Sequence, residues 1–270
     1  MSVDDRAIVH NVPKTTSCPR PPAVFNQVKH IVRTFRLPGS LLLIALALEV
    51  SSVRGANDAT SDVHRGGLVG WARLITPNQD WAVHSDRDPK LASFIRSQTS
   101  LNIDPVWYGV APNDVNALCT YPFIYAKDLT HIQNQQHLQN IQEYLKRGGF
   151  LFIDPCVSRL TEADKLELIQ KHTRLFKALF PDCTVRELPD DHEIYRCYFS
   201  VTVDALYTPD MIRIGRIKKP HLGLRGVLRK DRLVAVISTD GLECGWPETP
   251  QREPGCMQMI VNSYIYAMTR

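Results

Sequence analysis

Residues 148–156 read Gly148-Gly149-Phe150-Leu151-Phe152-Ile153-Asp154-Pro155-Cys156. The unbroken apolar run Phe150–Ile153 predicts a strand that is covered on both faces, as in a parallel sheet. The two glycines predict the end of a preceding helix, because glycine readily adopts the backbone conformation found just past a helix C-terminus. The strand is followed at once by a carboxylate, a proline and a thiol. A helix, a buried strand and a polar turn in this order are typical of α/β folds.

The chain on both sides of this stretch alternates in the same way. Apolar runs predict strands over residues 68–75, 106–110, 121–126, 150–153 and 184–188, and a hairpin over 225–238. Helical spacing and capping signals predict helices over residues 89–97, 130–147, 161–179 and 256–268. Thr130 is the expected cap of the second of these helices. Thr161 and Asp164 have the spacing of a capping box at the start of the third, whose expected buried stripe is Leu166, Ile169, Phe176 and Leu179. This alternation predicts a mostly parallel sheet with helices on both faces, formed by a single α/β domain over residues 67–270.

The first 55 residues have a different character. The apolar run Leu41–Leu48 follows Arg33 and Arg36, and it is too short for a membrane-spanning helix, which needs about 20 apolar residues. A basic flank, a short apolar run and small residues after it match a secretory signal. We therefore expect residues 1–55 to be a cleaved signal peptide or a signal anchor, and residues 56–66 to be a polar linker. The expected location is the periplasm or cell envelope, with membrane contact only through an uncleaved signal segment.

The formal net charge of +4 comes entirely from that first segment. Residues 1–55 carry seven Lys or Arg and three acidic residues, which leaves 25 residues of each sign in the rest of the chain. The basicity of the whole chain is therefore no argument for nucleic-acid binding, and we expect none. Residues 213–232 form a local basic patch with eight bases and one acid. Such a patch binds an anionic partner or simply faces solvent.

Export would expose six cysteines of the mature chain to an oxidising compartment. Their spacing suggests Cys183/Cys197 and Cys244/Cys256 as disulfides with short loops, although six cysteines allow about 15 connectivities. No Cys-x-x-Cys pair predicts a zinc ribbon or a thioredoxin-type site. No nucleotide-binding glycine motif or zinc-protease motif is present either, so we expect neither a cofactor nor a metal.

Binding sites in such sheets lie at the carboxyl ends of the strands. Asp154 and Cys156 occupy the place where α/β enzymes put a nucleophile on a strand-to-helix turn, which makes both candidate catalytic residues. The alternative is that Asp154 caps the turn and Cys156 packs as a small apolar residue or joins a disulfide. His192 lies in a Pro-Asp-Asp-His-Glu segment and is a candidate general base or, with Asp191, a metal ligand. The alternative is a solvated turn.

Four other side chains are candidates for ligand binding. They offer a carboxylate or a flat aromatic surface in loops next to predicted strands, and they are Asp191, Asp240, Glu243 and Trp246. The alternative for residues 238–246 is a glycine-rich turn over a core tryptophan.

Five blocks of the chain resemble, in order, the bacterial domain of unknown function 4159. They lie at residues 121–125, 144–154, 188–192, 241–246 and 261–269. The resemblance implies a three-layer α/β/α sandwich that is flavodoxin-like and class I glutamine-amidotransferase-like, and it implies no established activity. Family members often occur as domains of envelope proteins, in keeping with export. The Gly-Gly-strand and Asp-His segments are also similar to ThuA-like relatives, which implies binding of a carbohydrate or an envelope polymer.

The chain departs from the amidotransferase enzymes where their chemistry occurs. Their nucleophile is a cysteine in a Gly-x-Cys-x-Gly turn, whereas here the strand ends in Asp154 and Cys156 lies two residues later. No His-x-Glu follows His221. We therefore hypothesise a non-catalytic or regulatory exported domain that binds an envelope protein or polymer. The alternative is a hydrolase or transferase that uses Asp154 or Cys156 with His192.

Overall fold

The computed structural model describes residues 67–156, 160–206, 222–246 and 255–270. The expected signal segment, the linker over residues 56–66 and residues 213–219 of the basic patch lie outside these ranges. Within the described ranges, no helix has the length and apolar character that a membrane span requires.

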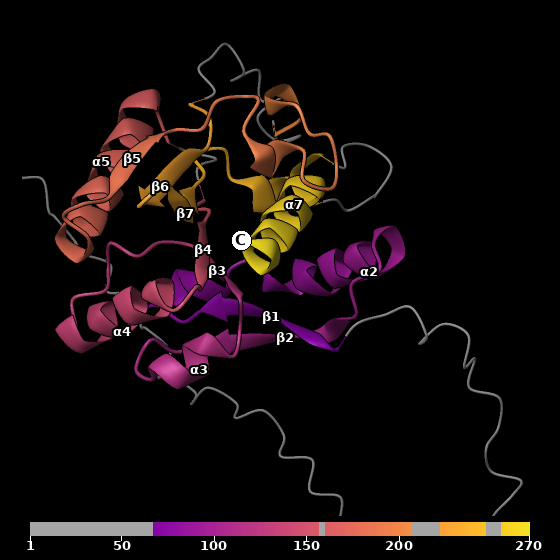
Figure 1. Ribbon diagram of the computed structural model, residues 1–270, viewed down its shortest axis with the longest axis horizontal. Helices are drawn as coiled ribbons and strands as arrows, with labels where there is room; N and C mark the ends of the chain where they lie inside the picture. The colour runs from indigo at the N-terminus through magenta and orange to yellow at the C-terminus, as the bar shows by residue number, and fades with distance from the viewer. Residues whose placement is uncertain (1–66, 157–159, 207–221, 247–254) are drawn as a thin grey trace, which may run out of the picture. The chain divides into compact units, whose positions relative to one another are not determined.

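Seven strands form one sheet in the order β2-β1-β3-β4-β7-β6-β5 (Figure 1). Their bounds are β1 Val69–Leu74, β2 Ile103–Val110, β3 Phe123–Ala126, β4 Phe150–Ile153, β5 Thr184–Glu187, β6 Arg225–Arg229 and β7 Arg232–Ile237. Strands β1 to β4 and β7 pair in parallel, whereas β6 is antiparallel to both β5 and β7. The predicted mixed α/β fold with a mostly parallel sheet is therefore confirmed.

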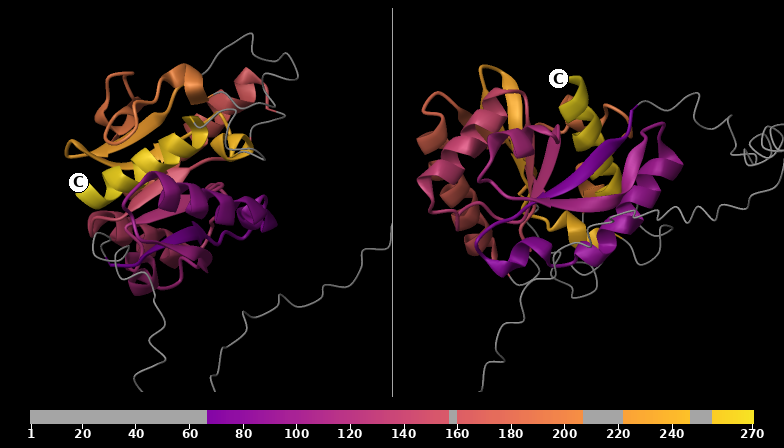
Figure 2. Two further views of the ribbon diagram at one scale, coloured as in Figure 1. Left: turned by 90° about the vertical axis from the view of Figure 1, so that its right-hand side faces the viewer. Right: turned by 90° about the horizontal axis from the view of Figure 1, so that it is seen from below.

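Helices cover both faces of the sheet. In the right-hand view of Figure 2, the sheet lies between two layers of helices. One layer consists of α2 (Asp88–Gln98) and α7 (Gly255–Thr269). The other consists of α3 (Val115–Cys119), α4 (Gln135–Lys146) and α5 (Glu162–Leu179). The short 3₁₀ segments are η1 Gln79–Ala82, η2 Ser85–Arg87, η3 Glu193–Tyr195, η4 Val203–Leu206 and η5 Leu242–Gly245.

Strand β4 lies at the centre of the sheet, and its side chains alternate between the two cores. Phe150 and Phe152 belong to the core under α2 and α7, and Leu151 and Ile153 belong to the core under α3, α4 and α5. All four are at most 2% exposed. Successive side chains of a strand point to opposite faces, so a strand covered on both faces needs an unbroken apolar run.

Helix α4 begins later than its sequence pattern predicts. We expected a cap at Thr130, but the Thr130 hydroxyl donates a hydrogen bond to Asp128 instead (2.9 Å). The helix starts after Asn134, whose side chain accepts hydrogen bonds from the backbone N–H groups of Gln136 and His137. Asn134 therefore supplies the hydrogen-bond acceptor that the first N–H groups of the helix require.

Two other predictions needed correction. Strand β2 begins at Ile103 rather than Val106 and contains Pro105, which is tolerated because β2 is an edge strand. Helix α5 has the predicted capping box, but its predicted stripe residue Leu166 is 41% exposed. Lys165 and His172 are buried instead. Apolar spacing alone cannot identify a buried stripe that contains a cation and an imidazole.

The end of α4 agrees with the prediction from Gly148 and Gly149. The helix ends at Lys146, and Gly148 adopts φ +108°, a backbone conformation that favours glycine. The buried Tyr144 hydroxyl then donates to the carbonyl of Phe150 (3.0 Å) and accepts from its N–H (3.1 Å). The last turn of α4 is thereby fixed to the first residue of β4.

We predict that Gly149→Ala destabilises the domain by about 1–3 kcal/mol. A Cβ atom at residue 149 would overlap the ring of Tyr144, and that ring cannot move without breaking its hydrogen bonds to Phe150. Urea unfolding measures the change. Gly67→Ala is the control, because a Cβ at residue 67 would meet nothing within 4 Å. Equal stabilities of the two variants would contradict the prediction.

Candidate functional site

Five charged side chains are buried together at the carboxyl edge of the sheet. We call them the ion cluster, and they are Arg73, Asp88, Lys127, Asp154 and Glu243. None is more than 4% exposed. Arg73 lies near the end of β1, Lys127 follows β3, Asp154 follows β4, Asp88 begins α2, and Glu243 lies in η5. Buried charges are tolerated only where they are paired and hydrogen-bonded, so their partners decide what this site can do.

The guanidinium of Arg73 is held by two carboxylates. Its Nε and Nη2 atoms donate to the two oxygens of Asp88, both at 2.5 Å, in a bidentate pair. Nη2 also donates to Oε1 of Glu243, and the other oxygen of Glu243 pairs with the Lys127 ammonium. Cζ of Arg73 lies 5.0 Å from the ring centroid of Tyr125. Glu243 therefore joins the end of β1 to the end of β3.

Asp154 is hydrogen-bonded through both oxygens. Oδ1 accepts from the N–H of Leu242 (2.9 Å), and Oδ2 accepts from the N–H of Glu243 (2.9 Å) and the hydroxyl of Tyr125 (2.8 Å). Burial raises the pKa of Asp154, while the Lys127 ammonium and these hydrogen bonds oppose the rise. Leu242 and Glu243 are the first residues of η5, so Asp154 caps a loop 88 residues away in sequence. With 0% exposure, it has no oxygen free for a substrate.

Two thiols lie next to the ion cluster. Cys156 is exposed and Cys244 is half-buried, and their side chains hydrogen-bond to each other. This hydrogen bond, followed by burial, raises the pKa of Cys244. The histidine whose charge interacts with Cys156 is His84, which adopts φ +63°. Burial lowers the pKa of His84, and Arg87 and Lys127 lower it further.

His192 lies elsewhere. Its Nδ1 accepts from the N–H of Ile194 (3.2 Å), and its ring centroid lies 6.0 Å from that of Tyr266. Tyr266 in turn contacts Phe150, at the amino end of β4, whereas Asp154 follows the carboxyl end of that strand. Burial lowers the pKa of His192, and the nearby Arg186 adds to this. The structure therefore brings Asp154 and Cys156 to one edge and places His192 against a different part of the domain.

Of the four side chains that were candidates for ligand binding, only Asp191 is exposed. Asp240, Glu243 and Trp246 are at most 2% exposed. The Trp246 ring packs 5.9 Å from Trp71 and serves as a core residue. In the described ranges, no group of three or more His, Cys, Asp or Glu side chains is arranged to hold a metal ion.

Sequence reasoning did not identify Arg73, Asp88, Lys127 or His84 as members of this region. A signal was present for two of them. Arg73 interrupts the apolar strand of residues 69–74, and Lys127 directly follows the apolar strand β3. A single charge in an apolar strand indicates a buried charge that must have a partner.

Neither suggested short-loop disulfide is present, and no disulfide joins any of the six cysteines in the described ranges. Cys183 is buried in the core under α4 and α5, whereas Cys197 packs on the core under α7. The sheet separates these two cysteines. The Cys256 thiol is buried 3.6 Å from the carbonyl of Leu206, while Cys244 pairs with Cys156.

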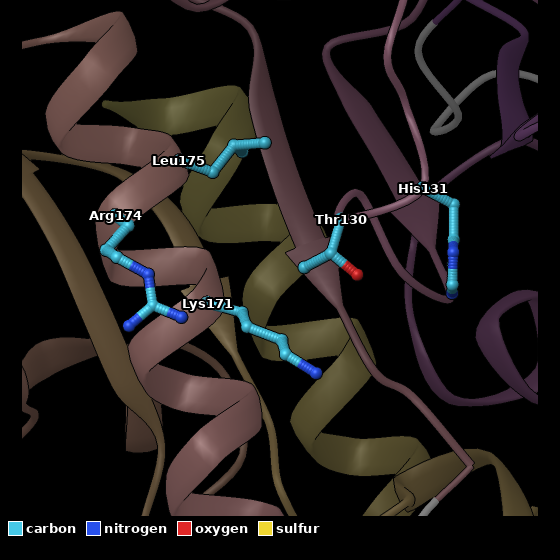
Figure 3. A pocket seen from close by; sticks show the side chains of 5 residues that line it. All are labelled: Thr130, His131, Lys171, Arg174 and Leu175. Carbon is cyan, nitrogen blue, oxygen red and sulfur yellow. The ribbon is translucent and has the colours of Figure 1, made fainter.

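A cationic cavity of about 320 Å³ lies beside the carboxyl end of β3. Figure 3 shows its lining side chains projecting from the loop after β3 and from α5, and they are Thr130, His131, Lys171, Arg174 and Leu175. Glu167 pairs with Lys171 (2.9 Å), and Asp128 lies 3.4 Å from His131. A second cavity, of about 370 Å³, has lining side chains of both charges, including Asp190, Arg196 and Asp204.

The carboxylate of Asp128, next to the first cavity, is already bound within the domain. It accepts from the N–H of Thr130 (2.8 Å) and pairs with the buried His172 (3.1 Å). Burial by itself would raise the pKa of Asp128, but the hydrogen bonds from His172 and Thr130 outweigh it and lower the pKa to about 2. Asp128 is thus ionised at neutral pH and fixes the loop that carries Thr130 and His131.

A family model with the description "Domain of unknown function (DUF4159)" matches residues 71–268. The matched region contains all five members of the ion cluster, both thiols and the residues around the cationic cavity. No curated protein matches the chain.

We predict that Glu243→Gln destabilises the domain by roughly 3–5 kcal/mol, because it leaves two buried cations without their shared carboxylate. Urea unfolding at pH 7 measures this loss. Glu143→Gln makes the same chemical change in an exposed ion pair with Arg147 and should have little effect. If the two variants lose equal stability, Glu243 is not the bridge that we describe.

We predict that Asp128 stabilises the fold only above acidic pH. Its pKa falls from 3.8 to about 2 on folding, so its contribution is complete above about pH 5 and is lost as the pH falls through 2. The contribution should be roughly 1–2 kcal/mol, allowing for partial screening by solvent. The gap between the unfolding free energies of wild type and Asp128→Asn should therefore shrink from pH 6 to pH 2.5. A constant gap would contradict this assignment.

Proposed function

This chain belongs to the DUF4159 family, and we propose that its domain is a non-catalytic binding domain of the bacterial cell envelope. The observation that carries the proposal is the state of Asp154. This carboxylate holds the position of an α/β nucleophile, yet it is 0% exposed and both oxygens accept hydrogen bonds from the domain itself. A catalytic acid, base or nucleophile must reach its substrate, and Asp154 is instead a cap for η5.

We assign the fold to the flavodoxin-like, class I glutamine-amidotransferase-like group. This assignment also supports a non-catalytic binding domain. The strand order β2-β1-β3-β4 matches the flavodoxin order, in which ligands bind where the order reverses between β1 and β3. Here Arg73 and Lys127 extend from those two strands and pair with Glu243. The backbone carbonyls of Trp81 and Val83 lie within 3.4 Å of Arg73. The usual ligand crevice is thus filled by side chains.

The binding surface that we propose is the cationic cavity. It also lies at the carboxyl end of β3, but on the side of α5 rather than α7. Arg174 is exposed and lines this cavity, and a guanidinium binds a carboxylate or phosphate through two parallel hydrogen bonds. We propose an anionic envelope polymer as the ligand. Polymers of this kind display repeated carboxylates or phosphates, which suit a site with three basic side chains.

Export is part of the proposal and rests on the basic flank and short apolar run of residues 1–55. Alkaline phosphatase folds to an active enzyme only where its disulfides form, outside the cytoplasm. Alkaline phosphatase fused after residue 66 of this chain should therefore be active in cells. The same fusion without residues 1–55 should be inactive. Equal activity of the two fusions would overturn the export part.

We predict that the full chain co-sediments with purified peptidoglycan sacculi, whose stem peptides carry carboxylates, and that binding weakens as salt rises. Arg174→Glu should lower the bound fraction several-fold, because it places a like charge beside the ligand. Lys90→Glu is the control, since it makes the same charge change at an exposed position of α2, outside the cavity. No binding by wild type, or equal losses in both variants, would overturn the cavity as the binding site.

A specific observation keeps the enzyme as the second candidate. Cys156 is exposed and lies within the electrostatic reach of Lys127 and His84. The discriminating measurement is complementation of a deletion strain by Cys156→Ser at the wild-type protein level. A binding domain tolerates this change. A complete loss of complementation by Cys156→Ser but not by Cys244→Ser, with intact sacculus binding, would favour catalysis by the Cys156 thiol over our proposal.

A further inference from the structure

The structure places two segments that are far apart in sequence next to each other at the carboxyl edge of the sheet. The hydrogen bonds from Leu242 and Glu243 to Asp154, both 2.9 Å, fix the start of η5 against the end of β4. Cys156 lies two residues after Asp154, and Cys244 lies two residues after Leu242. The two thiols are consequently held in contact and hydrogen-bond to each other.

We propose that Cys156 and Cys244 form a disulfide that covalently joins the end of β4 to η5. A disulfide requires two sulfur atoms that can approach to about 2.05 Å, and the hydrogen bond between these thiols places their sulfur atoms next to each other. The backbone around them is already fixed by the capping of η5 through Asp154. Cys183 and Cys197, by contrast, lie on opposite faces of the sheet.

The chemistry is thiol–disulfide exchange with an oxidant that is itself a disulfide, either a small molecule or a protein. The exposed Cys156 loses its proton, attacks one sulfur of the oxidant and releases the other sulfur as a thiolate. Cys244 then loses its proton and attacks the Cys156 sulfur of the mixed disulfide, which releases the second thiolate. The protein loses two protons and two electrons, and the oxidant disulfide is reduced to two thiols.

The charges around the pair favour Cys156 as the first nucleophile. The Lys127 ammonium lies within electrostatic reach of the Cys156 thiol, and a nearby cation stabilises a thiolate. Cys244 is half-buried and close to Asp154, which disfavours a second negative charge there. Cys156 therefore attacks the oxidant first, and Cys244 is the resolving thiol.

The disulfide between Cys156 and Cys244 would also hold one member of the ion cluster, Glu243, in position. Cys244 follows Glu243, the residue that joins Arg73 to Lys127. A covalent link to β4 holds η5, and with it Glu243, in place and closes a long loop of the unfolded chain, so it should stabilise the domain. This inference is independent of the polymer-binding proposal, because neither cysteine lines the cationic cavity.

The test uses the full chain, purified with reductant and then incubated with oxidised glutathione. Free thiols are alkylated after denaturation, and the digest is mapped by mass spectrometry without reduction. We expect a peptide pair that links Cys156 to Cys244, together with an alkylated Cys119, the exposed control thiol. If Cys156 and Cys244 are both alkylated, or each is joined only to glutathione or another cysteine, the proposal is overturned.

Thermal unfolding of the same samples provides the second measurement. Oxidised wild type should melt at least about 5 °C above the reduced protein. Cys156→Ser and Cys244→Ser should each abolish this difference, and Cys119→Ser should preserve it. A redox-dependent shift that survives Cys244→Ser would overturn the pairing. Sacculus binding of the oxidised and reduced forms is measured separately, so failure of the binding proposal is distinguishable from failure of this one.

Discussion

The pairing of Glu243 with both Arg73 and Lys127 is the interaction on which the arrangement of the carboxyl edge depends. A guanidinium at 0% exposure must be neutralised within the domain, and β1 itself offers no carboxylate to do so. Asp88 comes from the start of α2, and Glu243 comes from η5, 170 residues away in sequence. Because Arg73 needs these two carboxylates, it holds the start of α2 and the distant segment η5 at the carboxyl edge of the sheet. Asp154 completes the arrangement by capping η5 through its first two N–H groups.

This arrangement has a functional consequence. The point where the strand order reverses is the usual ligand site of related open sheets, and here it is closed by ion pairs. His84, with φ +63°, lies in the segment whose carbonyls contact Arg73, so some backbone strain is tolerated to cover the cluster. Open polar surface remains elsewhere, at the cationic cavity on the α5 side and at the thiol pair. Both features favour binding and covalent stabilisation over catalysis at Asp154.

The sequence predicted the elements with strong local signals. The unbroken apolar run of β4 required cover on both faces, and the capping box of α5 satisfies its own helix N-terminus, so neither needed distant partners. The start of α4 was wrong because Thr130 has a competing acceptor in Asp128, which sequence spacing does not reveal. The meeting of Asp154 with His192 that the alternative enzyme hypothesis requires is absent for a related reason. A shared strand edge was inferred from residue type, but the long loop after β5 carries His192 to Tyr266.

By itself, the sequence determined the fold class, the order of strands and helices along the chain and the family, because hydrophobic periodicity and short motifs are local properties. Only the tertiary structure decided the roles of the polar residues. Asp154 caps η5 because two backbone N–H groups from residues 242 and 243 reach it. Cys156 has Cys244 as its partner because that cap holds the two loops together. Contacts between residues some 88 positions apart depend on how the sheet is assembled, and no local pattern encodes them.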